Sequence, residues 1–405
     1  MSKKNEKFPL DYEKLREQII EFLESSNPHE AYSIIREILD YPGQIKTEAM
    51  FQDVMKLFEQ ISRNLAGDKL GDLVKEIITN PNDIRAIYDL AYELYEEKVY
   101  GIAATLLKRA NELYPQNVKI ITEFVSNLEA LMLNNEARII LSNTKDLLKS
   151  NEFCRYLLAY NSLMTGNINE PLKILPTIQG SSDKNIQYMA KALEGMLDRF
   201  SALKNERILD NTDLRGWHMV LNGSILLHLS PYGLDVMNGR YAYISDSYSL
   251  CKHGIERIKE VLKVVKIDIS RVISLPDRSS QILATATSKI LEKPLELSNE
   301  VDIKSGLIVS YDLNLSYSNE MYEQLKNHKT GQILWAHASN WVDPFPFTPD
   351  ITTFLYQSTA SPWGSRMAYD QKIKKLTTTK PDDSDIEELS EKIINAKKDE
   401  DYLDD

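Results

Sequence analysis

The sequence has few cysteines and no long apolar run, and both absences limit what the protein can be. The 405-residue chain holds two cysteines, Cys154 and Cys251, which lie far apart and match no metal-binding spacing. This usage favours a reducing compartment without a disulfide framework. No stretch approaches the ~18 apolar residues of a membrane span, and the basic N-terminus lacks the apolar core of a signal peptide. We therefore expect a soluble, cytoplasmic protein without membrane partners.

The sequence also lacks the glycine-rich and nucleophile motifs of the common enzyme classes. It contains no Gly-x-Ser-x-Gly elbow, no Walker loop, no Rossmann glycine triplet and no Cys–His nucleophile pattern. A net charge of −12 at pH 7 argues against a general nucleic-acid binder. The histidines of the second half match no zinc spacing, so we predict no metal site. They are His218, His228, His253 and His337.

The first half instead shows apolar residues at helical spacing from residue 12 to about 203. Within it, the segment that begins at Ile84 has three small residues that would let two helices of a hairpin approach closely, and Pro115 would end the second helix. These small residues are Ala91, Ala103 and Ala110. The segment resembles the tetratricopeptide repeat, a helix–turn–helix of 34 residues. A weaker copy begins at Phe153, with Leu158-Ala159 and Gly166 in the expected places but Pro171 where a small residue is usual.

Repeats of this kind bury their core only against neighbouring repeats, so one good copy implies several divergent ones. We predict a tetratricopeptide-like helical domain over residues 10–203. The resemblance implies that it binds a protein or peptide partner along its concave face. The alternative is that these helices only pack onto the second half of the chain.

The composition changes near Asn211. Two apolar runs, Trp217–Leu221 and Ser224–Leu229, are separated by Asn222-Gly223. Asn-Gly between apolar runs is a strong hairpin signal, because both residues tolerate positive φ. We therefore predict a β-hairpin here, with His218 and His228 on its two strands and close enough to offer a metal or acid–base pair as an alternative to buried, hydrogen-bonded histidines.

Beyond this point, short apolar runs alternate with helical patterns, which predicts a mostly parallel α/β sheet. The predicted strands are Val272–Leu275, Leu295–Leu297, Leu307–Tyr311, Ile333–Ala336 and Ile351–Tyr356. Asp277 or Ser279 would cap the helix after the first strand, and Ser316 or Ser318 the helix after the third. Both loops would lie at the carboxyl ends of parallel strands, where open α/β sheets bind ligands.

This order of strands, loops and helices resembles a type I phosphoribosyltransferase, which implies a phosphoribosyltransferase-like domain over residues 211–370. In that family, the first loop holds pyrophosphate and paired acids hold the ribose. Here Tyr311-Asp312 offers one acid, and the segment 315–319 has no glycine to let backbone N–H groups wrap a phosphate. We therefore expect a non-catalytic domain that senses a phosphorylated or nucleotide-like ligand. An enzyme acting on a phosphorylated sugar or nucleotide is the alternative.

The candidate ligand-binding residues follow from the two loops. Arg278 supplies charge, and the hydroxyls and carboxylates supply hydrogen bonds or hold Mg²⁺ if the ligand is phosphorylated. The set is Asp277, Arg278, Ser279, Ser280, Asp312, Ser316 and Ser318. No cofactor is otherwise expected. Ordinary helix capping by Asp277 and turn formation by Asp312 are the competing interpretations.

Two further features complete the sequence pattern. Trp335, Trp341 and Trp363 could line a pocket, anchor a partner, or pack as a structural lid. The segment 379–405 carries eleven acidic residues and four lysines, so we treat it as an acidic tail. Asp385 could cap a short amphipathic helix in this tail that docks on a partner or on its own chain. A solvated, partly disordered tail is the interpretation that we favour.

Overall fold

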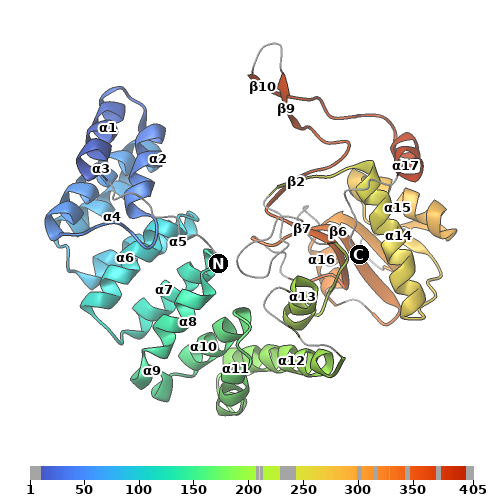
Figure 1. Ribbon diagram of the computed structural model, residues 1–405, viewed down its shortest axis with the longest axis horizontal. Helices are drawn as coiled ribbons and strands as arrows, with labels where there is room; N and C mark the ends of the chain where they lie inside the picture. The colour runs from blue at the N-terminus through green and yellow to red at the C-terminus, as the bar shows by residue number, and fades with distance from the viewer. Residues whose placement is uncertain are drawn as a thin grey trace. The chain divides into compact units, whose positions relative to one another are not determined.

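The computed structural model describes residues 11–206, 209, 213–228, 243–298, 303–313, 318–327, 329–342, 347–370 and 375–397. The chain divides into two compact units, Met1–Glu194 and Gly195–Asp405. The first is helical and the second is α/β (Figure 1). This agrees with the predicted division into a helical half and an α/β half.

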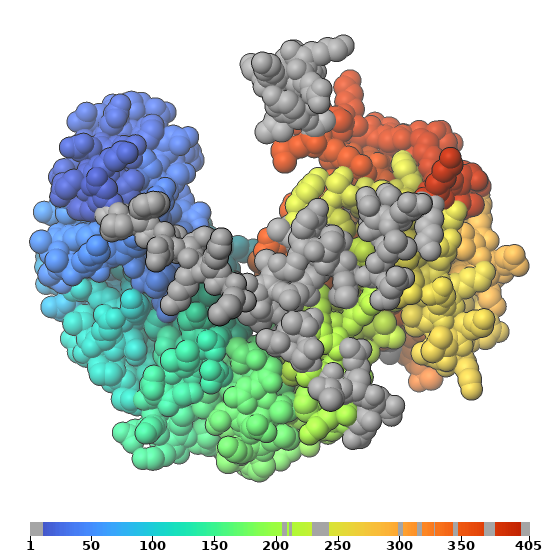
Figure 2. Space-filling model, viewed as in Figure 1, coloured from blue at the N-terminus to red at the C-terminus, as the bar shows by residue number. Residues whose placement is uncertain are grey.

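The helical unit is built from antiparallel hairpins in which each helix packs on the next one along the chain. Its helices are α1 (Tyr12–Glu24), α2 (Pro28–Leu39), α3 (Glu48–Ala66), α4 (Asp68–Thr79), α5 (Ile84–Glu96), α6 (Tyr100–Leu113), α7 (Val118–Ala130), α8 (Asn134–Ser142), α9 (Lys145–Ser150), α10 (Glu152–Met164) and α11 (Asn169–Ile174). A 3₁₀ turn, Leu175–Thr177, precedes α12 (Lys184–Glu206). Figure 2 shows the surface of this unit changing colour in chain order from blue to green, as expected of consecutive hairpins.

A 34-residue period is visible in the backbone of three consecutive hairpins. The N-caps of α5, α7 and α10 are Asp83, Asn117 and Asn151, and each side chain accepts a hydrogen bond from the helix it begins. The turn inside each hairpin contains one residue with positive φ, and these residues recur at the same interval: Lys98, Met132 and Gly166. The helical unit therefore repeats with the length that the sequence pattern of the segment after Ile84 predicted.

The packing inside the α5–α6 hairpin follows the prediction from its small residues. Ala91, Ala103 and Ala110 are buried, so the two helices meet through residues that add little bulk. Helix α6 ends at Leu113, two residues before Pro115. Proline cannot donate the backbone hydrogen bond that would continue the helix, and the steric restriction on the residue before it also favours an end here.

The core of the α/β unit is a six-stranded sheet with strand order β1-β7-β6-β5-β3-β4, in which every neighbouring pair is parallel. Its strands are β1 (Ile225–Leu226), β3 (Val272–Ser274), β4 (Leu295–Leu297), β5 (Gly306–Asp312), β6 (Gln332–Asn340) and β7 (Ile351–Tyr356). Two small sheets accompany it, β2–β8 (Tyr243–Ser245, Ser358–Ala360) and β9–β10 (Met367–Asp370, Lys375–Thr378). The predicted mostly parallel sheet is present, although this order does not itself confirm a phosphoribosyltransferase topology.

Helices cover both faces of the large sheet, which gives three layers. One face packs against α14 (Tyr248–Val264), α15 (Arg278–Leu291) and α17 (Ile386–Ile394), around residues such as Leu283, Val309 and Trp335. The other face packs against α16 (Asn319–Lys326) through Met321 and Leu325. Because both faces are covered, almost every residue of β5 and β7 is buried.

The predicted β-hairpin around Asn222-Gly223 is wrong. The first run forms a helix, α13 (Leu214–Asn222), and Gly223 ends it in the left-handed conformation with φ 70°. Trp217 and Val220 are buried at helical spacing, and Asp213 caps the helix by accepting from the backbone N–H of Gly216. Asn-Gly can end a helix as readily as it can turn a hairpin, because glycine adopts positive φ in both. The second run contributes the short strand β1.

The acidic tail is not solvated throughout, contrary to the interpretation that we favoured. Asp385 caps α17 as predicted, and Leu389 and Ile393 on that helix are fully buried against α14 and α15. The Ser390 hydroxyl donates to the Ile282 carbonyl of α15 at 2.9 Å. Helix α17 therefore packs into the α/β core. Within the described part of the chain, no helix combines the length and apolar character needed to span a membrane.

Candidate functional site

At the carboxyl edge of the large sheet, the two strands that lead into the predicted ligand loops lie side by side. Strands β3 and β5 are parallel neighbours, with Ser274 beside Val309, although β4 lies between them in the sequence. The chain thus reverses its strand order between β3 and β5. In open α/β sheets this reversal leaves a crevice at the carboxyl ends of the two strands, which is the usual place for a ligand.

In the first loop, the candidate side chains already have partners within the protein. Asp277 caps α15 by accepting from the Ser280 N–H at 2.8 Å. Arg278 donates to the backbone carbonyls of Asp382 and Ser384, at 3.0 and 2.8 Å, and so holds the segment that leads into α17. These contacts match the competing interpretation of ordinary capping, with the arginine used to fix the C-terminal segment.

The hydroxyls of the two serines in this loop also have hydrogen-bond partners within the protein. The Ser279 hydroxyl accepts from the Trp363 indole N–H at 2.9 Å. The Ser280 hydroxyl is fully buried and accepts from the backbone N–H of Tyr311 at 2.8 Å. Trp363 is 3% exposed and also contacts the Tyr311 ring. An aromatic side chain therefore occupies the space beside these hydroxyls.

In the second loop, Asp312 ends β5 and its carboxylate accepts from the Tyr356 hydroxyl at the end of β7. Ser318 is the N-cap of α16, where its hydroxyl accepts from the Met321 N–H at 3.3 Å. Ser316 lies outside the described residues. Asp312 and Ser318 are partly exposed at this edge of the sheet.

The candidate pocket aromatics are mostly core residues. Trp335 is fully buried and its indole N–H donates to the Thr353 hydroxyl at 2.9 Å. Trp363 packs in the same core. Trp341 is only half-buried, just beyond the end of β6. The geometry therefore favours the structural interpretation for Trp335 and Trp363.

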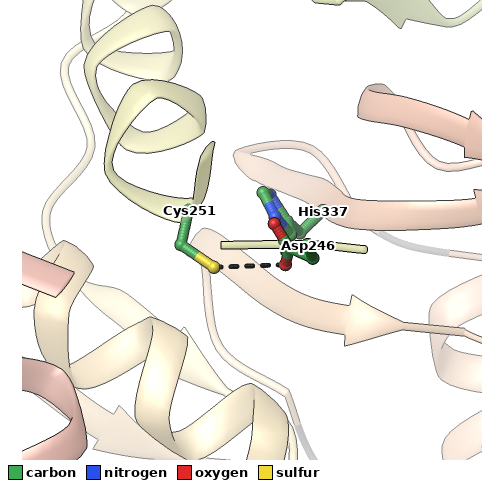
Figure 3. A group of neighbouring side chains, drawn as sticks. All are labelled: Asp246, Cys251 and His337. Carbon is green, nitrogen blue, oxygen red and sulfur yellow. Dashed lines mark hydrogen bonds and ion pairs between the residues drawn. The ribbon is translucent and has the colours of Figure 1, made fainter. Parts of the chain in front are cut away.

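A buried polar cluster that the sequence did not reveal lies beside this edge. The fully buried carboxylate of Asp246, between β2 and α14, accepts on Oδ2 from three side chains, two of which, Cys251 and His337, are drawn in Figure 3. The donors are the Tyr311 hydroxyl at 2.7 Å, His337 Nε2 at 3.1 Å and Cys251 Sγ at 3.3 Å. The other carboxylate oxygen, Oδ1, accepts from the backbone N–H of Ser247 at 2.7 Å.

Burial keeps two groups of this cluster, a thiol and a phenol, protonated. It raises the pKa of the Cys251 thiol well above its usual range, and the adjacent Asp246 carboxylate raises it further. Burial and Asp246 raise the pKa of the Tyr311 hydroxyl in the same way. Thiol and phenol therefore keep their protons and donate them to Asp246. His337 is also fully buried, and its Nδ1 has no hydrogen-bond partner among the described residues.

The sequence could not have predicted this cluster from spacing. Asp246 and Cys251 flank the start of α14, whereas His337 comes from β6, far along the chain. The folded sheet brings them together. The signal that was available, an aspartate and a cysteine around a helix N-terminus, is too common to identify a site.

The helical unit carries a second candidate surface, formed by the first helices of three consecutive repeats. Helix α7 contacts both α5 and α10. The rings of Tyr88 and Tyr92 stack at 6.4 Å, and those of Tyr156 and Tyr160 at 6.0 Å. Together with Tyr95, these residues are called the tyrosine face below. Tyr92 is 47% exposed and the other four are partly exposed.

Two glutamates of α7, Glu123 and Glu129, act electrostatically on tyrosines of both α5 and α10. Burial, and then neighbouring groups that include Glu123, raise the pKa of Tyr95. The pKa of Tyr156 is also raised, first by burial and then by the adjacent Tyr160 and Glu129. Glu129 itself is largely buried, which raises its pKa to about 7, although a hydrogen bond from the Asn161 amide at 2.6 Å opposes the shift.

Comparisons with known proteins leave the family open. No family model matches the chain, and no curated protein matches it. Among solved structures, one titled MamA AMB-1 is 15% identical, covers 44% of this chain and 97% of its own length, and has a TM-score of 0.25. Another, titled MamA MSR-1, is 17% identical, covers 44% and 94%, and has a TM-score of 0.24. Likenesses at these TM-scores carry no argument about function.

Proposed function

We propose that this protein is an interaction scaffold whose tetratricopeptide-like helical unit binds a segment of a partner protein on the tyrosine face. The observation that carries the proposal is the presence of partly exposed tyrosines on α5 and α10, the helices that contact α7 from the repeats before and after it. Tyrosine combines a large apolar ring with a hydroxyl and loses little conformational entropy on binding. It is accordingly enriched among the residues that contribute most to interfaces.

The charges beside the tyrosine face indicate the chemistry of the partner. Glu123 and Glu129 lie between the two groups of tyrosines, and burial raises the pKa of both carboxyl groups. A carboxylate that is costly to ionise in the free protein gains most from a nearby cation. We therefore expect a partner segment that presents lysine or arginine next to apolar or aromatic side chains, which would also place a cation over tyrosine rings.

Selection from a random peptide library tests this proposal. The full-length protein, immobilised at moderate salt, should enrich peptides that combine basic and apolar residues, and their binding should weaken as salt is added. Tyr114 is a suitable control, because it belongs to the same unit and is 44% exposed, close to the value for Tyr92. The proposal fails if no such peptides are enriched. It also fails if the Tyr92→Ala and Tyr114→Ala variants enrich them to the same extent.

A second candidate function belongs to the α/β unit: sensing a phosphorylated or nucleotide-like molecule at its sheet edge, with Mg²⁺ if the ligand carries phosphates. The strand-order reversal between β3 and β5 favours it, and Asp312 and Ser318 are the residues best placed to contribute. An enzyme on such a ligand is the alternative. Thermal-shift measurements with nucleotides and sugar phosphates test it: stabilisation that Asp312→Asn abolishes supports sensing, and product formation would support the enzyme.

A further inference from the structure

The buried cluster of the α/β unit contains the donor set of a metal site. Asp246, Cys251 and His337 are each fully buried, and each offers one ligand atom within 4.8 Å of the other two. They supply a carboxylate oxygen, a sulfur and an imidazole nitrogen. This mixture of oxygen, sulfur and nitrogen donors is typical of zinc sites.

Two of the three separations between these atoms are close to those that a tetrahedral ion needs. Asp246 Oδ2 lies 3.3 Å from Cys251 Sγ and 3.1 Å from His337 Nε2. With Zn–S near 2.3 Å and Zn–N or Zn–O near 2.0 Å, tetrahedral ligands are separated by roughly 3.3 to 3.5 Å. These two separations are therefore within a few tenths of an ångström of the tetrahedral values, and the third, between Cys251 Sγ and the His337 ring nitrogen, is within 4.8 Å. The Tyr311 hydroxyl, 2.7 Å from the same Oδ2, is a further oxygen at this place.

His337 provides an independent observation. Its Nδ1 is buried without a hydrogen-bond partner among the described residues, and buried polar atoms of this kind are uncommon. When Nε2 binds a metal, Nδ1 carries the ring proton and becomes a donor. The Nδ1 side of the ring faces Gly254 and the Thr353 hydroxyl, since Nδ1 and Thr353 Oγ1 each lie 3.1 Å from the point that a Cβ on residue 254 would occupy.

We propose that Asp246, Cys251 and His337 form a buried structural site for a divalent zinc-like ion in the α/β unit. Binding replaces the proton of the Cys251 thiol, which leaves to solvent, while the proton on His337 Nε2 is exchanged for one on Nδ1. The thiolate and the carboxylate together balance the two positive charges of the ion. Tyr311 keeps its hydroxyl on the ligating carboxylate and so fixes its orientation.

Because all three ligands are inaccessible to solvent, the ion enters as the chain folds. The ligands then join the start of α14 to the end of β6, so metal binding adds to the free energy of unfolding of the α/β unit. The same side chains form a hydrogen-bonded network among themselves. The competing account is that this network is complete by itself and no ion binds.

The metal content of the full-length protein, followed by refolding, separates the two accounts. The protein is unfolded in denaturant with a chelator and refolded with Zn²⁺, with Co²⁺ or with chelator alone. We expect one Zn²⁺ per chain and a higher melting temperature than with chelator. We also expect Co²⁺ to give the near-ultraviolet absorption of a cobalt–thiolate bond together with the visible bands of a tetrahedral site.

The two cysteines supply a matched control, because Cys154 is also fully buried but lies in α10 of the helical unit. Cys251→Ala should abolish the cobalt–thiolate absorption, and Cys154→Ala should leave it unchanged. His337→Gln retains a donor toward Asp246 but loses the imidazole ligand. It should abolish the tetrahedral spectrum even if Cys251→Ala does not fold. Tryptophan fluorescence checks folding, since all four tryptophans belong to the α/β unit.

Two results would overturn the proposal. In the first, the unaltered protein refolds with Zn²⁺ or Co²⁺ without gaining stability or a thiolate band. The cluster is then a hydrogen-bonded carboxylate and nothing more. In the second, the thiolate band persists in a folded Cys251→Ala variant, or the tetrahedral spectrum persists in a folded His337→Gln variant, which would place the ion elsewhere.

Discussion

The substitution Leu389→Ala tests whether the acidic C-terminal helix is part of the α/β core. Leu389 is fully buried on α17, in one apolar cluster with residues of α14 and α15. Truncating a fully buried leucine removes its transfer free energy and leaves a cavity, at a total cost of about 2 to 5 kcal/mol. The surrounding ion pairs, such as Lys392 with Asp382, are too exposed to compensate. We expect the free energy of unfolding of the α/β unit to fall by about 3 kcal/mol.

Urea denaturation monitored by tryptophan fluorescence isolates this effect. All four tryptophans lie between residues 195 and 405, so their emission reports on the α/β unit alone. Far-ultraviolet circular dichroism follows the helical unit as well, and its helical transition should be unchanged. Leu297→Ala is the matched control, because Leu297 is 61% exposed on strand β4. It should cost no more than about 0.5 kcal/mol.

The reasoning is refuted if the two leucine variants unfold at the same urea concentration. Leu389 would then contribute no buried surface in solution, and the residues after 379 would be the solvated tail that their composition suggests. A fall confined to the slope of the transition would instead indicate a change in the surface exposed on unfolding.

The remaining predictions concern single groups. Glu129, whose pKa burial raises to about 7, favours the folded helical unit when protonated. The contribution of Glu129 to the free energy of unfolding is therefore fully present below about pH 4.5 and is lost as the pH rises through 7. The loss is at most about 3 kcal/mol, and Glu129→Gln should remove this pH dependence from the dichroism transition. Arg278→Ala releases two carbonyls and should lower the stability of the α/β unit by about 1 kcal/mol. If Arg278 instead binds phosphate, that variant would also lose any thermal shift caused by nucleotides. Gly254→Ala places a Cβ 3.1 Å from His337 Nδ1 and should cost about 1 to 3 kcal/mol, measured by the same fluorescence transition.

Much of the α/β unit could be predicted because its strands are short apolar runs with clear ends. Leu295–Leu297 and Ile351–Tyr356 form the predicted strands with the predicted bounds. Asp277 and Ser318 act as the predicted helix caps. Buried parallel strands and capped helices are local features, so one sequence is enough to indicate them.

Features that depend on tertiary contacts were missed. Asn222-Gly223 satisfies the local rules for a hairpin. The burial of Trp217 and the N-cap at Asp213 instead stabilise a helix before it. The repeat formed by α7 and α8 escaped notice, because its period is carried by caps and turn conformations, such as Asn117 and Met132, rather than by a pattern of small residues. The partners of Arg278 come from a segment more than a hundred residues away.

The proposed role of the tyrosine face is tested most directly by titrating a selected basic peptide into the full-length protein, Tyr92→Ala and Tyr114→Ala by calorimetry. We predict that Tyr92→Ala lowers the affinity about 30-fold, the loss expected when an interface residue worth about 2 kcal/mol is truncated. Tyr114→Ala should bind like the unaltered protein. Equal affinities for all three proteins would contradict the proposal that this face is the binding surface.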